Sequence, residues 1–363
     1  MKKVVISVIN DLATDQRVEK VSNTLFQNNY EVLLIGRKLP NSLPINRNYK
    51  THRMKLIFNS GKLFYLEYNF RLFFFLLFTK KDILLSNDLD TLLGNYYAGK
   101  LTNTPLVYDS HELFTEVPEL IHRPKTQAIW ERLENKLLPK IKHCYTVCDS
   151  IATFYNKKYS TNFKVIKNVP VLNPNFEEYS EKDIPFSSKK VLIYQGAVNV
   201  GRGIELMIDS MKFLPEDYQL LIVGDGDIFD AIKERVSEKK LENKILILGR
   251  ISPKKLKSIT KKAHLGFSLE EELGLSYKFA LPNKLFDYIH AEIPALVSNL
   301  PEMSNIVTKY QIGKVVKNRD PKAIAEQIMS FETKSYSKQL KNAKQDLNWN
   351  HESTKLLTIF NEI

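Results

Sequence analysis

The stretch Tyr194–Gly203, with the sequence YQGAVNVGRG, joins an apolar run, KKVLI, to a helical pattern that starts at Ile204. The apolar run predicts a buried strand, so the stretch is a strand-to-helix turn that holds three glycines and one arginine. Glycine lets the backbone approach a ligand closely, and a helix N-terminus offers free N–H groups and a partial positive charge. Arg202 adds a forked donor set that suits phosphate. The turn therefore indicates an anion-binding site, and a tight turn with a solvated arginine is the alternative.

The same alternation of short apolar runs and helical patterns continues on both sides of this turn. The runs before it are VVISVI, EVLLIG, DILLS, PLVYD, HCYTV and FKVIKN, and those after it are YQLLIVG, KILILG, HLGFSL, PALVSN and GKVV. Strands that are apolar on both faces and separated by helices are typical of parallel sheets covered by helices. The sequence predicts an α/β fold of two Rossmann-like, doubly wound domains that face a cleft, with ligands beyond the carboxyl ends of the strands.

The chain is long enough for two domains, since 363 residues exceed what one ordinary core supports. The alternating pattern breaks at Asn168–Ser188, where prolines and polar residues replace it. We expect a first domain over residues 1–170 and a second over residues 171–345.

The positive charge is concentrated in the first half. Residues 1–170 carry 25 Lys and Arg against 15 Asp and Glu, a net charge of +10 out of +12 for the chain. Such a surface fits a phosphorylated substrate, an anionic membrane or nucleic acid. No helix-turn-helix, zinc-finger or RNA-binding motif accompanies the charge, so we do not expect nucleic acid as a partner.

The cysteines and the N-terminus indicate a reducing compartment. Cys144 and Cys148 are the only cysteines, and no suitably spaced histidine accompanies them, so we expect two reduced, buried thiols and no metal site. The N-terminal MKKVVISVIND runs directly into a strand without an apolar signal region, which predicts a cytoplasmic chain.

An ordered set of motifs extends the interpretation. YQGAVNVGRGIELMIDSM, LLIVGDGD, ILGRISPKKL and LPNKLFDYIHAEIPALVSNLPEM follow one another in the second half, with TDQRVEK and YDSHELF in the first. Together they make nearly the whole chain resemble the retaining GT-B glycosyltransferases of family 4. The resemblance implies transfer of a hexose from a nucleoside-diphosphate sugar, held by the second domain, to a cell-surface glycan or lipid-linked acceptor at the first. It also implies that no cofactor takes part and that a C-terminal helix, residues 346–363, crosses back to the first domain.

The chemistry of a nucleotide sugar requires positive charge at the leaving diphosphate, where negative charge grows as the glycosidic bond breaks. Arg202 and Lys284 are the expected cations, and a surface lysine in the first helical turn is the alternative for Lys284. Family members usually carry a lysine where this chain has Arg202. Many also carry an arginine directly after the first glycine, where this chain has Ala197, so one family cation is missing.

The resemblance also assigns residues to the donor. The expected donor-binding residues are Gly196, Gly201, Gly203, Gly249, Ser276, Asn283 and Asp287. Of the two glutamates that family members place eight residues apart, the second aligns with Asp287, for which a ribose contact and a plain helix-face role are both open. The first aligns with Phe279, and the run Glu270–Glu272 offers a carboxylate that reaches the sugar or, alternatively, a solvated loop.

In the first half, the resemblance points to His111 and to the start of the first helix. The family places a histidine at the position of His111 against the donor sugar, and we expect a neutral imidazole that bonds a sugar hydroxyl; a structural histidine at a strand end is the alternative. Asp15 and Arg17 are expected to contact the acceptor, against the alternative of a helix N-cap and a surface ion pair.

Two further segments carry competing signals. Asp88 and Asp90 imitate the Asp-x-Asp motif by which GT-A transferases bind a metal, but Asp90 suits a helix N-cap, and we expect no metal. The apolar core of Asn69–Asp82 is too short to span a bilayer. A core helix is favoured there, and the alternative is an interfacial helix with Arg71, Lys80 and Lys81 at lipid head groups, which would place the chain weakly at the inner face of the membrane.

Two rival functions remain open on the same fold. A sugar-nucleotide epimerase would need acid and base carboxylates that flank the sugar. A degenerate protein would bind sugar nucleotides without turnover, and Ala197 and Phe279 are the residues that favour it.

Overall fold

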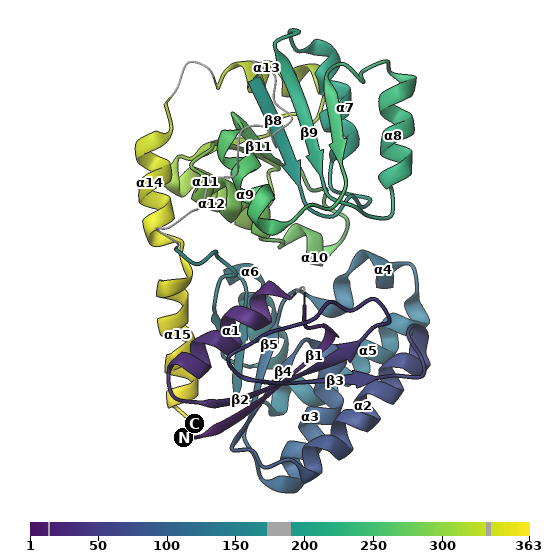
Figure 1. Ribbon diagram of the computed structural model, residues 1–363, viewed down its shortest axis with the longest axis vertical. Coiled ribbons are helices and arrows are strands. Elements are labelled where there is room, and N and C mark those ends of the chain that lie inside the picture. Colours follow the sequence, from purple (N-terminus) through teal and green to yellow (C-terminus); the bar gives the residue numbers. More distant parts are fainter. Residues whose placement is uncertain (14, 173–189, 332–334) are drawn as a thin grey trace. The chain divides into compact units, whose positions relative to one another are not determined.

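The computed structural model describes residues 1–13, 15–172, 190–331 and 335–363 (Figure 1). Contacts divide the chain into a first unit, Met1–Asn168 with Glu352–Ile363, and a second unit, Val169–His351. Most of the expected interdomain segment, Asn168–Ser188, lies outside the described residues.

The first unit is a parallel sheet with the strand order β3-β2-β1-β4-β5-β6-β7, covered by helices (Figure 1). Its strands are β1 Lys3–Asp11, β2 Glu31–Lys38, β3 Lys50–Lys55, β4 Ile83–Asn87, β5 Leu106–Ser110, β6 His143–Thr146 and β7 Phe163–Val165. Its helices include α1 Gln16–Gln27, α2 Gly61–Phe78, α3 Leu89–Thr102, α4 Pro118–Ile121, α5 Pro124–Leu137 and α6 Asp149–Tyr159. The strand order reverses between β1 and β4, and this switch point is where doubly wound sheets bind ligands.

The second unit repeats this arrangement with the order β10-β9-β8-β11-β12-β13. Its strands are β8 Lys190–Gln195, β9 Tyr218–Val223, β10 Ile245–Leu248, β11 Leu265–Ser268, β12 Ala295–Val297 and β13 Gly313–Val315. Its helices include α7 Ile204–Ser210, α8 Phe229–Glu238, α9 Pro253–Lys262, α10 Leu275–Lys278, α11 Asn283–Ala291, α12 Pro301–Tyr310, α13 Pro321–Met329 and α14 Ser337–Asp346. Here the switch point lies between β8 and β11. The predicted fold of two Rossmann-like parallel sheets is confirmed.

The last helix, α15 Trp349–Asn361, contributes its residues from Glu352 onward to the first unit. The Tyr30 hydroxyl donates to Asn361 Oδ1 at 3.2 Å, and the Tyr30 ring packs edge-on against Phe360. Glu352 accepts a hydrogen bond from the backbone N–H of Lys167 at 2.9 Å. These contacts fasten the end of the chain to the first sheet.

Strand β3 was not predicted, because its sequence KTHRMK contains no apolar run. Among the described residues it pairs with β2 alone, at the edge of the sheet, where polar and charged side chains are tolerated and discourage pairing with another chain. Helix α2 also differs from expectation, since it begins at Gly61, eight residues before the expected Asn69. Within the described residues, no helix is long and apolar enough to cross a membrane.

Glycines let backbone segments of the second unit approach one another at the switch point. Gly224 follows β9 with φ of +147°, and a Cβ atom there would overlap the carbonyl oxygen of Gly196, which directly follows the neighbouring strand β8. Gly249, after β10, has no atom within 4 Å of such a Cβ. Gly224 therefore sets the spacing of the two turns, whereas Gly249 tolerates a side chain.

We predict that Gly224→Ala lowers the free energy of unfolding by about 1–3 kcal/mol or more, since it adds backbone strain and a clash with Gly196. Gly249→Ala, the matched control, should change it by less than about 1 kcal/mol. Urea denaturation of both variants measures the difference. Equal stability of the two variants would contradict the packing described here.

Candidate functional site

The turn after β8 contains three glycines at positions where other residue types would be strained or would clash. Gly196, Gly201 and Gly203 have φ of +131°, +78° and +71°. A Cβ on Gly203 would overlap the carbonyl oxygen of Leu269, and one on Gly201 would overlap the Leu273 side chain. The turn thus packs backbone to backbone on the loop that follows β11, and it brings Arg202 close to that loop.

A buried carboxylate, Glu270, lies between the two cations that the sequence singled out. Lys284 Nζ donates to Glu270 Oε1 at 2.7 Å, and Arg202 Nη1 lies 4.0 Å from the same oxygen. Ser268 Oγ donates to the other carboxylate oxygen at 2.8 Å. The exposed fractions are 0% for Glu270, 8% for Lys284 and 23% for Arg202. The alternative of a surface lysine is therefore wrong for Lys284, as is that of a solvated loop for Glu270.

Aromatic rings complete the surroundings of these charges. Lys284 Nζ lies 4.2 Å from the centre of the Tyr194 ring, and the Arg202 guanidinium lies 4.7 Å from that of Tyr277. Burial acts to raise the pKa of Glu270, but Lys284 and the hydrogen bonds outweigh it and lower this pKa below its usual value. Glu270 is thus an ionised carboxylate that holds positive charge at the switch point.

The donor-binding candidates lie around this cluster to different degrees. A Cβ on Gly196 would be 3.6 Å from Lys284 Cε, so the lysine stem lies against the glycine turn. Asp287, one helical turn after Lys284, accepts a hydrogen bond from Gln195 Nε2 at 2.9 Å, at the end of β8. Ser276 is buried in α10, Asn283 is exposed at the start of α11, and Gly249 is exposed after β10. Their roles toward a donor stay predictions.

Arg319, which the sequence analysis missed, holds the loop that carries Glu270. Its Nη1 donates to Ser298 Oγ at 2.8 Å, and its Nη2 donates to the carbonyl oxygen of Leu269 at 3.1 Å. Arg319 follows β13, at the carboxyl edge of the sheet where functional loops gather. Its place after a predicted strand was the sequence signal that could have identified Arg319. The residue lies outside every motif that carried the resemblance.

At the switch point of the first unit, His111 lies between two carboxylates. Its Nδ1 is 3.0 Å from Asp88 Oδ2, and its Nε2 is 3.3 Å from Asp109 Oδ2. Burial acts to lower the pKa of His111, but the two carboxylates outweigh it and raise this pKa well above its usual value. The expectation of a neutral imidazole does not fit these surroundings, which favour the imidazolium. The ring is 21% exposed.

Arg17 holds Asp109, one of the two carboxylates beside His111, in place. Its Nε and Nη2 donate to the two oxygens of Asp109 at 2.9 and 2.7 Å, and its Nη1 donates to the carbonyl oxygen of Ile166 at 2.9 Å. Burial acts to raise the pKa of Asp109, but Arg17 and His111 lower it to about 2. The Arg17 side chain is 4% exposed, so the expected direct contact with an acceptor does not fit, and neither does a surface ion pair.

For the remaining candidates of the first unit, Asp15, Asp88 and Asp90, the structure changes part of the expected roles. Asp15 is the N-cap of α1 and accepts from the backbone N–H of Val18 at 3.1 Å, so its acceptor role stays a prediction beside a structural one. Asp90 is not an N-cap, because α3 begins at Leu89 and Asp88 occupies the cap position with φ of +57°. Burial raises the pKa of Asp90 well above its usual value. Among residues 1–13, 15–172, 190–331 and 335–363, no group of three His, Cys, Asp or Glu side chains could hold a metal ion.

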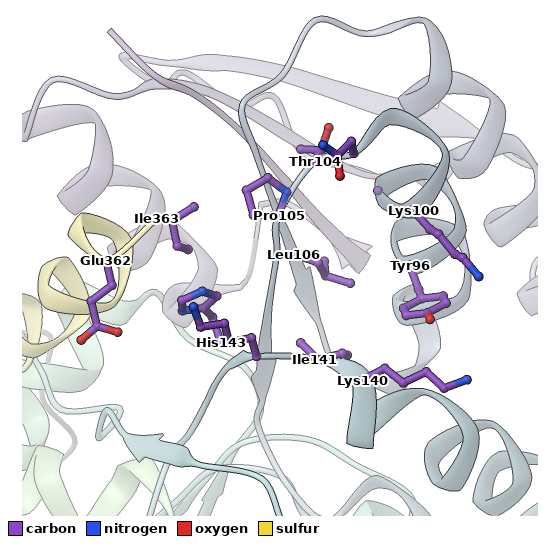
Figure 2. A pocket seen from close by; sticks show the side chains of 13 residues that line it. Tyr96, Lys100, Thr104, Pro105, Leu106, Lys140, Ile141, His143, Glu362 and Ile363 are labelled. Atoms are coloured by element: carbon purple, nitrogen blue, oxygen red, sulfur yellow. The ribbon is translucent and has the colours of Figure 1, made fainter.

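A hollow of about 600 Å³ lies at the opposite edge of the first sheet (Figure 2). It is lined by the amino-terminal ends of β5 and β6, the end of α3 and the C-terminal residues Glu362 and Ile363. Its lysines, Lys100, Lys140 and Lys142, are exposed. Ligands of parallel sheets bind at the carboxyl edge, so the charge clusters, and not this hollow, form the candidate site.

The comparisons with known proteins point to glycosyltransferases. Residues 175–346 match the family model of the glycosyl transferases group 1. The 2-deoxystreptamine N-acetyl-D-glucosaminyltransferase of Niallia circulans is 23% identical over 67% of this chain, and the O-antigen chain mannosyltransferase RfbU of Salmonella typhimurium is 27% identical over 55%. The matched regions span 64% and 49% of the length of these relatives.

Solved structures share the fold over the whole chain. Sucrose-phosphate synthase from Thermosynechococcus elongatus superimposes with a TM-score of 0.81 at 15% identity, covering 100% of this chain and 99% of the other. HepE of Anabaena in complex with UDP-glucose gives a TM-score of 0.77 at 13% identity, covering 100% of both chains. At these identities the likeness shows the fold, which is that of the GT-B glycosyltransferases.

We predict that Asp88→Asn lowers the pKa of His111, because it removes one of the two carboxylates that stabilise the imidazolium. Titration of the histidine ring protons by NMR measures this shift. His52 serves as an internal control, since burial lowers its pKa below the usual value independently of Asp88. In the unmodified protein, a His111 that loses its proton at a lower pH than His52 would refute the stabilisation of the imidazolium by Asp88 and Asp109.

Proposed function

We propose that the chain is a glycosyltransferase of the group 1 family and that it moves a hexose from a nucleoside-diphosphate sugar to a cell-surface glycan or lipid-linked acceptor. In this proposal the second domain, residues 171–345, holds the donor. The first domain, residues 1–170, holds the acceptor. The reaction retains the configuration of the anomeric carbon and needs no metal, and it takes place on the cytoplasmic side of the membrane.

The observation that carries the proposal is the cluster of Arg202, Glu270 and Lys284 against the Gly196 turn. In the transfer, the bond between the anomeric carbon and the diphosphate oxygen breaks, and its electron pair leaves with the diphosphate. Arg202 and Lys284 neutralise this charge, and they are already positioned by Glu270 and by aromatic rings before the donor binds. Charges fixed in advance stabilise a transition state without the cost of reorienting during the reaction.

The other half of the transfer concerns the acceptor. Its hydroxyl oxygen forms the new bond to the anomeric carbon on the face that the diphosphate leaves, and its proton passes to the departing diphosphate. The His111 imidazolium adds positive charge at the carboxyl edge of the first sheet, and Asp88, Asp109 and Arg17 hold its ring in place. Asp15, at the start of α1, is the acceptor-side candidate.

The relatives support the substrate class. Two of them are named as a 2-deoxystreptamine N-acetyl-D-glucosaminyltransferase and an O-antigen chain mannosyltransferase, so their names share the transfer of a hexose-type sugar, and the second names a cell-surface glycan. HepE was determined with UDP-glucose, which supports a nucleotide sugar as donor. A thermal-shift screen of UDP- and GDP-linked hexoses on the purified chain identifies the nucleobase and the sugar.

We predict that Arg202→Ala and Lys284→Met each slow release of the nucleoside diphosphate in a single turnover by about 10²–10³, because each removes a charge that stabilises the leaving group. Arg235→Ala and Lys233→Met are the matched controls, since both residues lie on α8, where Lys233 pairs with Asp230 and Arg235 pairs with Asp209 of α7. The controls should keep the rate of the unmodified protein.

Loss of Lys284 leaves Glu270 buried without its main partner, which destabilises the fold. The double variant Glu270→Gln/Lys284→Met removes both charges and separates folding from catalysis. It should unfold at nearly the temperature of the unmodified protein and remain slow. Restored turnover in the double variant would rule out Lys284 as a stabiliser of the diphosphate.

We predict that EDTA leaves the transfer rate unchanged, because the positive charge at the donor comes from side chains. The measurement compares product formation before and after chelation, with added Mg²⁺ or Mn²⁺ as a second arm. Activity that is lost with EDTA and restored by either ion would show that a metal takes part.

A further inference from the structure

Helix α2 exposes an apolar face along its whole length. Its exposed apolar side chains, spaced three or four residues apart, are Leu63, Leu66, Phe70, Phe74 and Phe78, with exposed fractions of 54%, 63%, 63%, 43% and 87%. This spacing places them on one side of the helix, which we call the α2 ridge. The other side packs Phe64, Tyr68, Leu72 and Leu76 into the core of the first unit. The helix is therefore apolar nearly all round, although only one side is covered.

The loop before α2 extends this surface. Ile57 and Phe58 are 74% and 42% exposed, and their backbone N–H groups donate to the Glu67 carboxylate at 2.9–3.0 Å. Of the 17 large apolar side chains that are exposed in the described part of the chain, seven lie between Ile57 and Phe78. Such a concentration marks an interaction surface, because scattered apolar residues are normal on a protein but a contiguous patch is not.

The surroundings of the α2 ridge are basic. Residues 50–81 contain seven Lys and Arg and one acidic residue, Glu67. The charge of Glu67 is used within the protein, since it accepts the loop N–H groups and pairs with Arg71 at 2.8 Å. A hollow of about 510 Å³ between β3 and α2 combines both characters: Arg53, Lys55 and Arg71 lie beside Phe70 and Phe74. His52, stacked on Phe75, adds little charge there, because burial lowers its pKa.

We propose that the α2 ridge and the basic residues around it dock the first unit on an anionic lipid bilayer. The ridge enters the interfacial region, and the basic side chains, including those of the hollow, contact lipid phosphates. A second copy of the chain fits this surface poorly, since a symmetric contact would bring two sets of basic residues together. The inference rests on the proposed function, because docking would give the enzyme access to a lipid-linked acceptor. Vesicle binding itself can be measured without a donor and without sugar transfer.

The test is co-sedimentation of the full chain with vesicles of phosphatidylcholine alone or mixed with phosphatidylglycerol. We expect binding to the anionic vesicles only, and weaker binding as salt is raised. Lys62→Gln/Lys80→Gln should weaken binding by roughly tenfold or more, because each basic residue near an anionic surface contributes several-fold in affinity. Phe70→Ser/Phe74→Ser should weaken it similarly. Leu101→Ser/Phe213→Ser, which removes exposed apolar side chains elsewhere, is the matched control and should bind normally.

Two outcomes would overturn the proposal: equal binding of the Phe70/Phe74 variant and the unmodified protein, or a dimer in sedimentation velocity that only this variant loses. Nucleoside diphosphate release with a water-soluble acceptor is measured in parallel. Ridge variants that keep this activity but lose vesicle binding support the docking surface. Absence of activity in every form, with vesicle binding intact, would count against the proposed function alone.

Discussion

A buried carboxylate at the carboxyl edge of each sheet is the constraint on which both candidate clusters depend. An unpaired buried charge costs several kcal/mol, so each carboxylate must have cationic partners. Glu270 has Lys284 and Arg202, and Asp109 has Arg17 and His111. In both units the requirement of stability therefore fixes positive groups at the edge where ligands bind.

The two clusters differ in what remains accessible. Arg17 is sealed inside, and its donors are used by Asp109 and Ile166, so the accessible group of the first cluster is the His111 ring. In the second cluster Arg202 is 23% exposed and lies 4.0 Å from Glu270, at the limit of an ion pair. Lys284 is 8% exposed and donates to Glu270 at 2.7 Å. Arg202 is therefore the more accessible cation of the cluster, and Lys284 is the one that Glu270 holds.

Most of the fold was predictable from the sequence because parallel strands buried on both faces are continuous apolar runs. Every apolar run interpreted as a strand became one, from β1 to β13. The exception, β3, is polar because it lies at an edge, and its strand character comes from pairing with β2 rather than from its own residues. Helix α2 begins earlier than expected. Its first turns, GKLFYLEY, give no local sequence signal that marks where the helix starts.

The candidate site was predictable in its residue types and much less so in its partners. The glycine turn predicts the role of Arg202 from neighbouring residues. The hydrogen bonds between Arg17 and Asp109 join residues 92 apart in sequence, and no local pattern predicts such a pair. The same limit explains the error at His111, whose protonation is decided by Asp88 and Asp109 together, on the ends of neighbouring strands. A motif can name the chemical group, but its charge follows from the groups that the topology brings beside it. This is why Ala197, where the resemblance implies a missing cation, does not by itself remove the positive charge at the turn: Lys284 reaches the same turn from α11, with its stem against Gly196.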